Sequence, residues 1–174
     1  MKKILVVIDM QNDFIDGALG TPEAEAIVDK VVDKIMSYPK ENIYGTMDTH
    51  HEGYLDTQEG RNLPRWHCVY NTIGWKLSRY IEPLIDKDRF YTKNSFGSPF
   101  LVSELLYLNE KEPIEIEIVG LCTDICVVSN ALILKSFLPE VPITVDAKCC
   151  AGVTPETHEA ALKTMEMCQI KVVR

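Results

Sequence analysis

The sequence of 174 residues contains no apolar stretch that approaches the length of a membrane-spanning helix, so we expect no partner in a membrane. It also has no basic excess: 18 lysines and arginines against 26 acidic residues give a net charge of -8. A chain without a basic stripe does not displace counterions from a phosphate backbone, which argues against nucleic acid as a partner. Repeats, linkers and low-complexity segments are absent too. The length suits one well-filled core, and we expect a single domain over residues 1–174.

No export signal is recognisable either. Met1-Lys2-Lys3 and the apolar run that follows resemble the start of a signal peptide, but the run ends at Asp9 without a small-residue cleavage site, so we expect a first strand there. The six cysteines lack the spacing of a disulfide framework, and reduced thiols in a cytoplasmic protein are the expected state. The pair Cys149-Cys150 would suit a redox switch, but neighbouring cysteines form a strained disulfide, which favours two small buried residues.

Strand and helix patterns alternate along the chain. The expected strands are residues 4–8, 42–47, 90–92, 114–119, 143–146 and 170–173. The expected helices are residues 21–36, 73–85 (interrupted at Pro83), 100–108, 124–134 and the segment after Thr154-Pro155. This alternation indicates an α/β domain with a parallel sheet and right-handed crossovers. The polar stretch 51–64 is too long for a routine connection, and such loops carry function or are disordered.

The segment 120–127 (GLCTDICV) is the most informative part of the sequence. It follows an expected strand and opens an expected helix, so Cys126 falls in the first helical turn. Unpaired N–H groups and the positive end of the helix dipole favour a thiolate there, and a lowered thiol pKa distinguishes a nucleophilic cysteine from an inert one. The alternative interpretation is a small buried apolar residue, which is what most free cysteines are.

Two charged residues at neighbouring strand ends favour the nucleophile. Ligands of an open parallel sheet bind outside the carboxyl ends of its strands, where Asp9 and Lys93 follow the first and third strands. Asp9 can take the proton of the Cys126 thiol, while Lys93 favours the ionised forms of both acids. Taken singly, Asp9 is more typical of a turn and Lys93 of a solvated surface. Asp146 follows the fifth strand, and a lone carboxylate there is more typical of a helix cap or loop.

A second group of residues suggests a metal site. Asp48 and His50 alternate at the end of the second strand, so both side chains can point at one ion, and His67 beyond the long loop can close the site. Carboxylate with imidazole ligation suits Zn, Mn or Fe. Two histidines and an aspartate also occur together by chance. His51 is adjacent but would point away if His50 points in, and His158 is expected on the surface.

Three segments resemble the signature segments of the isochorismatase-like cysteine hydrolases: residues 8–14 (IDMQNDF), Lys93 and residues 120–127. Residues 145–156 are similar to that family's late strand and helix start, so the resemblance spans nearly the whole chain. Asp48-Thr49-His50, with residues 67–69 (HCV), further resembles the metal site of the nicotinamidase branch, which isochorismatases proper lack.

The resemblance implies a three-layer α/β/α sandwich with a six-stranded parallel sheet. It implies a catalytic triad of Asp9, Lys93 and Cys126, and a non-proline cis peptide between Leu121 and Cys122. The backbone N–H groups of Cys122 and Cys126 would then form an oxyanion hole.

The resemblance also implies one divalent metal ion, Zn or else Mn or Fe, on Asp48, His50 and His67. Glu59 is the candidate for a fourth ligand and Asp56 is the alternative. Phe14 would pack on the substrate ring. Some relatives carry a second aromatic at the position of Pro64, so Trp66 is our candidate for that role.

The function that follows is a metal-assisted cysteine amidohydrolase, a nicotinamidase that converts nicotinamide and water into nicotinate and ammonia through a thioester on Cys126. The resemblance places it in cytoplasmic NAD salvage and leans toward homo-oligomers. One alternative is another hydrolase of the family, acting on a ureide or carbamoyl compound or on isochorismate, which would not need the metal. The other is a non-catalytic redox or binding module, against which the intact triad counts.

Overall fold

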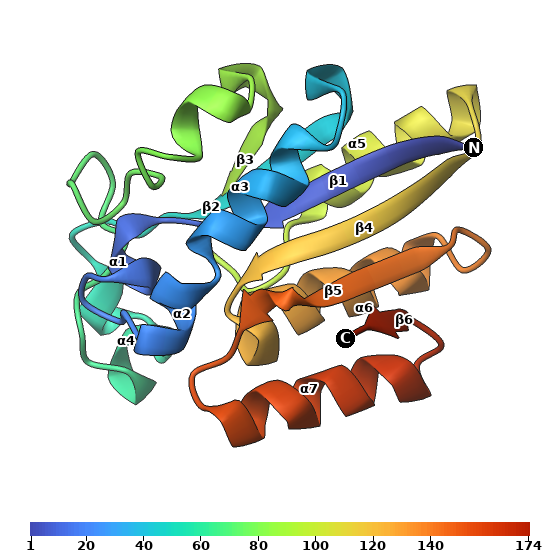
Figure 1. The fold of residues 1–174 in the computed structure, drawn as a ribbon. Coiled ribbons are helices and arrows are strands. Elements are labelled where there is room, and N and C mark those ends of the chain that lie inside the picture. The colour runs from blue at the N-terminus through green and yellow to red at the C-terminus, as the bar shows by residue number, and fades with distance from the viewer.

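Six parallel strands form one sheet at the centre of the molecule in the computed structural model, which describes residues 1–174 (Figure 1). The strands are β1 (Lys2–Ile8), β2 (Ile43–Asp48), β3 (Phe90–Lys93), β4 (Ile114–Leu121), β5 (Ile143–Ala151) and β6 (Lys171–Val173). All six predicted strands are present, in the order β3-β2-β1-β4-β5-β6. Because β1 pairs with β2 on one side and β4 on the other, the order of the sheet reverses at β1, which is where ligands bind in sheets of this kind.

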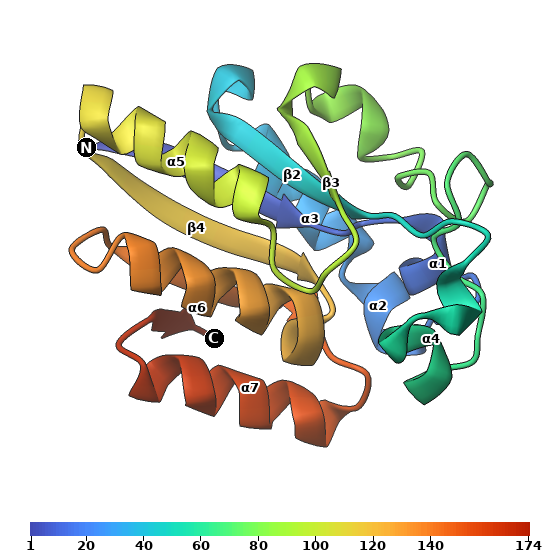
Figure 2. The ribbon, with the colours of Figure 1, turned by 180° about the vertical axis from the view of Figure 1, so that it is seen from behind.

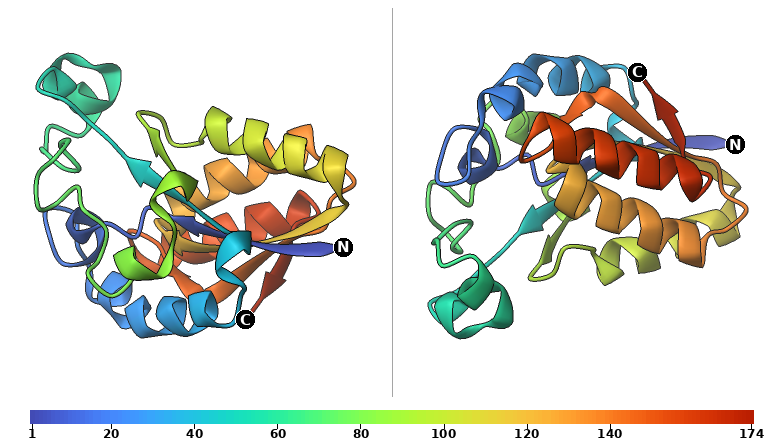
Figure 3. Two further views of the ribbon diagram at one scale, coloured as in Figure 1. Left: turned by 90° about the horizontal axis from the view of Figure 1, so that it is seen from above. Right: turned by 90° about the horizontal axis from the view of Figure 1, so that it is seen from below.

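Helices cover both faces of the sheet and complete the predicted three-layer α/β/α sandwich. One face carries α5 (Pro99–Lys111), α6 (Val128–Phe137) and α7 (Pro155–Met167), which lie in front of the sheet in Figure 2. The other face carries α2 (Pro22–Ala26) and α3 (Val28–Met36), and Figure 3 shows the two helical layers on opposite sides. The remaining helices, α1 (Asn12–Ile15) and α4 (Gln58–Asn62), lie in the connections at the carboxyl end of the sheet.

The apolar run of β1 explains why two layers are needed. Successive side chains of a strand point to opposite faces, so Val6 and Ile8 join the core under α5, α6 and α7, while Leu5 and Val7 join the core under α2 and α3. These four side chains are at most 1% exposed. A strand that is apolar on both faces is stable only where both faces are covered.

Local sequence signals place the starts of α2, α5 and α7 correctly to within a residue, but they do not predict α1 and α4. Thr21 and Thr154 cap α2 and α7 through their side chains, each followed by a proline in the first turn. The single helix expected over residues 21–36 is instead two helices, which divide at Ile27. The helix expected from Asp124 begins with a π-helical turn over Thr123–Val127 before α6.

The prediction of a helix over residues 73–85 is wrong. This segment consists of turns and one 3₁₀ turn, Glu82–Leu84, and Ile73 is 80% exposed. Within the segment the backbone makes only isolated turn bonds, and it also bonds to the chain after β1: Asn12 N–H donates to the Lys76 carbonyl at 2.9 Å, and Ser78 N–H donates to the Met10 carbonyl at 2.9 Å. Long-range backbone pairing has replaced the helical hydrogen bonds that the local pattern predicts.

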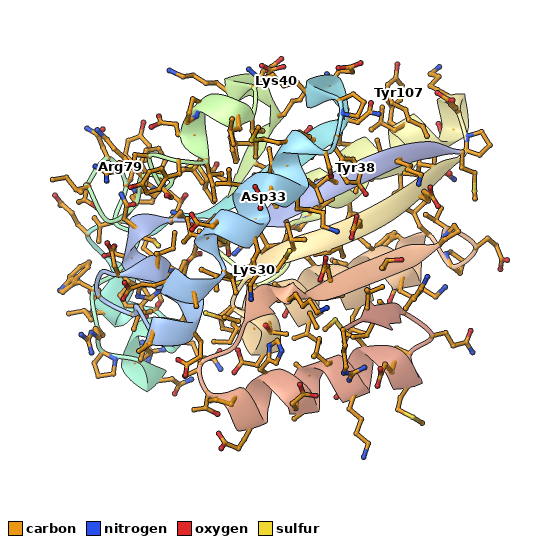
Figure 4. The ribbon with its side chains drawn as sticks, viewed as in Figure 1. Lys30, Asp33, Tyr38, Lys40, Arg79 and Tyr107 are labelled. Carbon is orange, nitrogen blue, oxygen red and sulfur yellow. The ribbon has the colours of Figure 1, made fainter.

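Asp146 does not follow the fifth strand as predicted, because β5 continues to Ala151. Its carboxylate lies 2.8 Å from Lys34 Nζ on α3, and the same ammonium lies 2.8 Å from a Glu117 oxygen on β4. Tyr38, beyond the end of α3, also donates to Glu117. Figure 4 shows Tyr38 beside the sheet and Asp33 on the solvent side of α3.

The long polar stretch 51–64 is ordered around two short elements, the 3₁₀ turn Tyr54–Asp56 and α4. Tyr54 is 2% exposed and anchors the stretch, and its hydroxyl donates to the Leu63 carbonyl at 2.9 Å. Cys149 and Cys150 are both buried and unbridged. None of the helices has the length and apolar composition that a membrane crossing requires.

Candidate active site

The carboxyl ends of the four strands from β3 to β4 bring the predicted residues to one place. Asp9 follows β1 with a φ of 45°, which turns the chain out of the strand. Lys93 ends β3 and pairs in register with Asp48 at the end of β2. A side chain at Gly120 on β4 would lie 2.1 Å from the Ile8 carbonyl oxygen, so only glycine lets the ends of β1 and β4 approach this closely.

Asp9, Lys93 and Cys126 form one buried cluster. Lys93 Nζ lies 2.7 Å from Asp9 Oδ2 and 3.4 Å from Cys126 Sγ. The three residues are 0%, 5% and 4% exposed. An acid, a cation and a thiol are therefore in direct contact and out of bulk water, as the sequence predicts for a nucleophile with its base.

Burial makes the Cys126 thiol less acidic than the sequence predicts. The sequence predicts a lowered thiol pKa at the helix start, but burial, followed by the Asp9 carboxylate, raises the pKa of the Cys126 thiol well above its usual range. Burial also raises the pKa of Asp9, although Lys93 opposes this increase. Burial thus disfavours the charged form of both groups, and the thiol must lose its proton before a thiolate can form.

Thr46 is a polar contact that sequence reasoning missed. Its hydroxyl donates to Asp9 Oδ1 at 2.6 Å, and Thr46 is fully buried on β2. Because this oxygen is occupied, the other oxygen, Oδ2, faces Lys93. A threonine inside a strand has no local signature of such a role, since only the pairing of β1 with β2 brings it to Asp9.

Gln11 holds the end of β2 against the chain after β1. Its side-chain amide pairs with the Asp48 backbone in both directions: Nε2 donates to the Asp48 carbonyl at 2.8 Å and Oε1 accepts from the Asp48 N–H at 2.7 Å. The amide therefore substitutes for a strand pair after β1 has turned away, and it fixes the position from which the Asp48 side chain projects.

Cys126 lies in the π-helical turn, which follows a cis peptide bond between Leu121 and Cys122. The backbone N–H of Cys122 donates no hydrogen bond within the protein. Two side chains of this turn bond to residues outside it: Asp124 accepts from the Val153 N–H at 3.1 Å, and Thr123 Oγ1 lies 2.8 Å from His158 Nδ1. His158 is therefore not the free surface histidine that the sequence predicts.

Beside this cluster, Asp48, His50, Glu59 and His67 present four ligand atoms that all lie within 4.8 Å of one another. His50 Nε2 is 2.9 Å from Asp48 Oδ2 but is not aligned for a hydrogen bond, so this buried nitrogen has no hydrogen-bond partner. His67 Nδ1 lies 2.9 Å from the Arg65 carbonyl oxygen, which fixes its ring and leaves Nε2 toward the cluster.

These observations fit a divalent cation. An orphaned imidazole nitrogen facing carboxylates is costly to bury without a partner, and a metal ion satisfies all four groups at once. A carboxylate that binds a metal ion must be ionised. Burial raises the pKa of Asp48, but His50, His67 and Lys93 outweigh burial and hold that pKa below its usual range. Asp56 and His51, the alternatives left open by the sequence, are not in the cluster.

A cavity of about 540 Å³ connects the two clusters. Its wall includes Cys126 at one side, Asp48, Glu59 and His67 at the other, and Phe14. The other lining residues are Leu19, Gln58, Asn62, Leu63, Ser95, Phe96, Cys122 and Ile125. Trp66, the candidate for a second aromatic contact, is 43% exposed and lies outside this lining, with its ring 5.9 Å from Tyr54. Phe96 is an aromatic of the cavity that sequence reasoning missed, because nothing local marks it.

The fold and this site define a class of protein: an α/β/α sandwich that carries a buried cysteine, carboxylate and lysine at the point where the strand order reverses. The isochorismatase domain model matches residues 3–174, and the chain belongs to the isochorismatase family. The uncharacterized isochorismatase family protein PncA of Bacillus subtilis (strain 168) is 31% identical over 176 residues, which cover 93% of each chain.

Two solved structures are similar over essentially their full lengths. Nicotinamidase PncA from Bacillus subtilis is 28% identical with a TM-score of 0.82, and the match covers 100% of both chains. Pyrazinamidase of Pyrococcus horikoshii in complex with zinc is 26% identical with a TM-score of 0.79, over 100% of this chain and 99% of that one.

Proposed function

We propose that the protein is a metal-assisted nicotinamidase that hydrolyses nicotinamide to nicotinate and ammonia. The observation that carries this proposal is a single cavity lined by Cys126 and by Asp48, Glu59 and His67, three members of the cluster that His50 completes. A heteroaromatic carboxamide has matching ends, a reactive carbonyl carbon and a ring nitrogen. The likeness to nicotinamidase and pyrazinamidase structures supports the same substrate class.

Asp9 acts as the general base for the nucleophile. It takes the Cys126 proton, and the resulting thiolate attacks the carboxamide carbon to form a C–S bond. Burial raises the pKa of Asp9, which makes its carboxylate a stronger base than an exposed one. Lys93 lies against both groups and balances the negative charge as it moves from the carboxylate to the sulfur.

The carbonyl oxygen becomes an oxyanion as the C–S bond forms. The backbone N–H groups of Cys122 and Cys126 are the proposed donors to it, and the Cys122 N–H is free to act because it has no acceptor within the protein. One donor of this kind is worth on the order of 3 kcal/mol in the transition state. The C–N bond then breaks, and ammonia leaves with the proton that Asp9 returns.

The thioester that remains on Cys126 is hydrolysed in the second half of the reaction. Asp9, again a carboxylate, takes a proton from water, and the hydroxide adds to the thioester carbon. Breakage of the C–S bond releases nicotinate and restores the thiol. Phe14 lies in the cavity wall and packs against the substrate ring during both steps.

Asp48, His50, His67 and Glu59 would hold one divalent cation, for which zinc suits the two imidazoles and two carboxylates. The cation, when bound, would supply a Lewis acid that fixes the ring nitrogen of the substrate. The side chains themselves set this position, because Gln11 fixes the Asp48 backbone and the Arg65 carbonyl orients His67.

Ammonia release from nicotinamide tests the proposal. We expect Cys126→Ala to lose turnover to the level of the uncatalysed reaction, because Cys126 carries the thiol that contacts Lys93, whereas the Cys122 thiol in the cavity wall has no hydrogen bond to Lys93. Cys168→Ala is the matched control, since it removes an exposed thiol remote from the cavity and should retain wild-type turnover. Activity that persists in Cys126→Ala would remove the nucleophile assignment. Turnover of a ureide in place of nicotinamide would move the protein to another branch of the family.

A further inference from the structure

Asn130 connects the turn that carries Cys126 to a second segment of the cavity wall. It lies on α6 one turn after Cys126 and is 0% exposed. Its Nδ2 donates to the Cys126 carbonyl at 2.8 Å and to the Phe96 carbonyl at 3.1 Å, and its Oδ1 accepts from the Ser98 N–H at 2.9 Å. One side chain therefore binds three backbone groups on two separate segments.

The helix itself does not explain this residue. Asparagine is a poor residue for a helix interior, and a buried amide is costly unless its donors and acceptors are satisfied. Here both N–H donors are used, and two of the three bonds go to residues more than 30 positions away along the chain. The hydrogen bonds to the segment before α5 therefore explain why an asparagine is favourable at this position.

That segment, residues 95–98, is called the wall segment here. Ser95 and Phe96 line the cavity, and Ser98 caps α5 by accepting from the Leu101 N–H at 3.3 Å. A side chain at Gly97 would lie 3.5 Å from the Ser129 carbonyl, so the wall segment rests on α6 at van der Waals distance. Apart from such packing, the Asn130 amide provides the hydrogen bonds from α6 to this segment.

We propose that Asn130 is a positioning residue that sets the distance between the wall segment and Cys126, and so holds the substrate ring in line with the sulfur. Asn130 contacts neither the cavity nor the reacting atoms: it acts through Phe96 on one side and the Cys126 backbone on the other. The inference rests on the proposed amide hydrolysis, because Phe96 then bounds the slot that the ring occupies.

Two variants separate the wall contact from the helix contact. Asn130→Ala removes all three bonds. Asn130→Thr keeps a hydroxyl that can donate to the carbonyl four residues earlier, which is that of Cys126, but it cannot bridge to the wall segment. We expect both variants to raise KM for nicotinamide about ten-fold with kcat within about three-fold, because a loosened wall weakens ring binding more than bond making.

Asn109→Ala is the matched control. This substitution also removes a partly buried hydrogen bond between two elements, in which the Ile114 N–H of β4 donates to Asn109 Oδ1 of α5 at 3.2 Å. Asn109 is not among the residues that line the cavity. It should lower Tm and leave KM unchanged. Wild-type KM in Asn130→Thr would overturn the proposal, since the Cys126 carbonyl bond alone would then suffice. A lower Tm with unchanged KM in both Asn130 variants would also overturn it.

A readout without substrate keeps this test independent of the proposed function. The rates at which Cys126 is alkylated by iodoacetamide and by the bulkier N-ethylmaleimide, followed by peptide mapping, report the width of the cavity. We expect Asn130→Thr to raise the N-ethylmaleimide rate relative to the iodoacetamide rate about five-fold or more, and an unchanged ratio would contradict the proposal. If the wild type does not hydrolyse nicotinamide, the proposed function fails while this ratio still decides the role of Asn130. Asn130→Thr, which keeps most of the side-chain volume, carries the decision should Asn130→Ala not fold.

Discussion

The pKa values of single residues in the site depend on burial as much as on neighbouring charges. Cys126 and Lys93 are in contact, which by itself would favour a thiolate, yet burial raises the pKa of the thiol. The same burial raises the pKa of Asp9, so acid and base are adjusted together. The raised pKa of Cys126 disfavours the thiolate, which is the form that oxidants and alkylating agents attack.

Thr46 provides a test of the base at this scale. Its hydroxyl stabilises the ionised form of Asp9 and so lowers the pKa of that carboxyl. In Thr46→Val we expect the Asp9 pKa to rise, and the base form is then lost at a higher pH. The acidic limb of the kcat/KM profile for nicotinamide should move to higher pH by about one pH unit. Thr144→Val, a substitution of the same type on β5 away from the cavity, should leave the limb in place. An unmoved limb in Thr46→Val would show that another group titrates.

At the scale of elements, α3 is attached to the sheet by charge as well as by its apolar face. Val31 and Ile35 bury against the sheet, while Lys34 reaches the carboxylates of Glu117 and Asp146 on two neighbouring strands. The alternating pattern of β4, in which Glu117 stands among isoleucines, predicts a face near water. The structure shows that α3 covers this face and supplies the counter-charge.

Lys34→Met measures this attachment. The substitution leaves two carboxylates that are 18% and 11% exposed without their counter-charge, and we expect the free energy of unfolding at pH 7 to fall by about 3 kcal/mol. Burial raises the pKa of Asp146, but contact with Lys34 outweighs it and lowers that pKa. The stabilisation from the pair of Lys34 and Asp146 is therefore present above the unfolded-state pKa of about 4, and it is lost as the pH falls through the lower folded-state pKa of Asp146. The difference in unfolding free energy between Lys34→Met and wild type should therefore shrink in acid.

The control for Lys34→Met is Lys40→Met, which breaks a pair of the same length, 2.8 Å to Asp86, on an exposed surface. Exposed pairs contribute about 1 kcal/mol or less, so chemical denaturation at pH 7 should barely distinguish this variant from wild type. Equal losses in the two variants would indicate that Lys34 acts through its aliphatic chain and not through its charge.

At the scale of the whole molecule, the parallel arrangement of the sheet collects residues that are far apart in sequence. The ends of β1, β2, β3 and β4 supply Asp9, Asp48, Lys93 and the turn with Cys126. The two clusters are also coupled electrostatically, since Lys93 Nζ lies 3.8 Å from Asp48 Oδ1 as well as 2.7 Å from Asp9. A change of charge in the cluster of Asp48, His50, Glu59 and His67 therefore alters the electrostatic environment of Asp9.

Metal removal tests this larger unit. We expect purified protein to bind one divalent ion per chain by elemental analysis, and a chelator to remove it with loss of turnover while the circular dichroism spectrum is retained. Tm should fall, because an ion that binds only the folded state stabilises it. His67→Ala should lose the ion, whereas His51→Ala, which alters an exposed histidine outside the cluster, should retain it. Normal turnover of metal-free protein would restrict the cluster to a structural role.

Tertiary contacts decided several features that local sequence could not. Glu59, and not Asp56, lies with Asp48, His50 and His67, because α4 starts after Thr57 and turns Glu59 inward. Trp66 lies outside the cavity, while Phe96 lines it. Such outcomes depend on the path of loops, which local periodicity does not report.

The sequence by itself determined the six strands, the starts of α2, α5 and α7, and the residues Asp9, Lys93 and Cys126 as a group. These follow from apolar periodicity, capping residues and the rule that parallel strands end at one edge, all of which are local or topological. Only the tertiary structure decided the raised pKa values of Asp9 and Cys126 and the hydrogen bonds that Thr46 and Asn130 make to these two residues. Burial and long-range hydrogen bonds set these properties, and they exist only once distant segments have packed together.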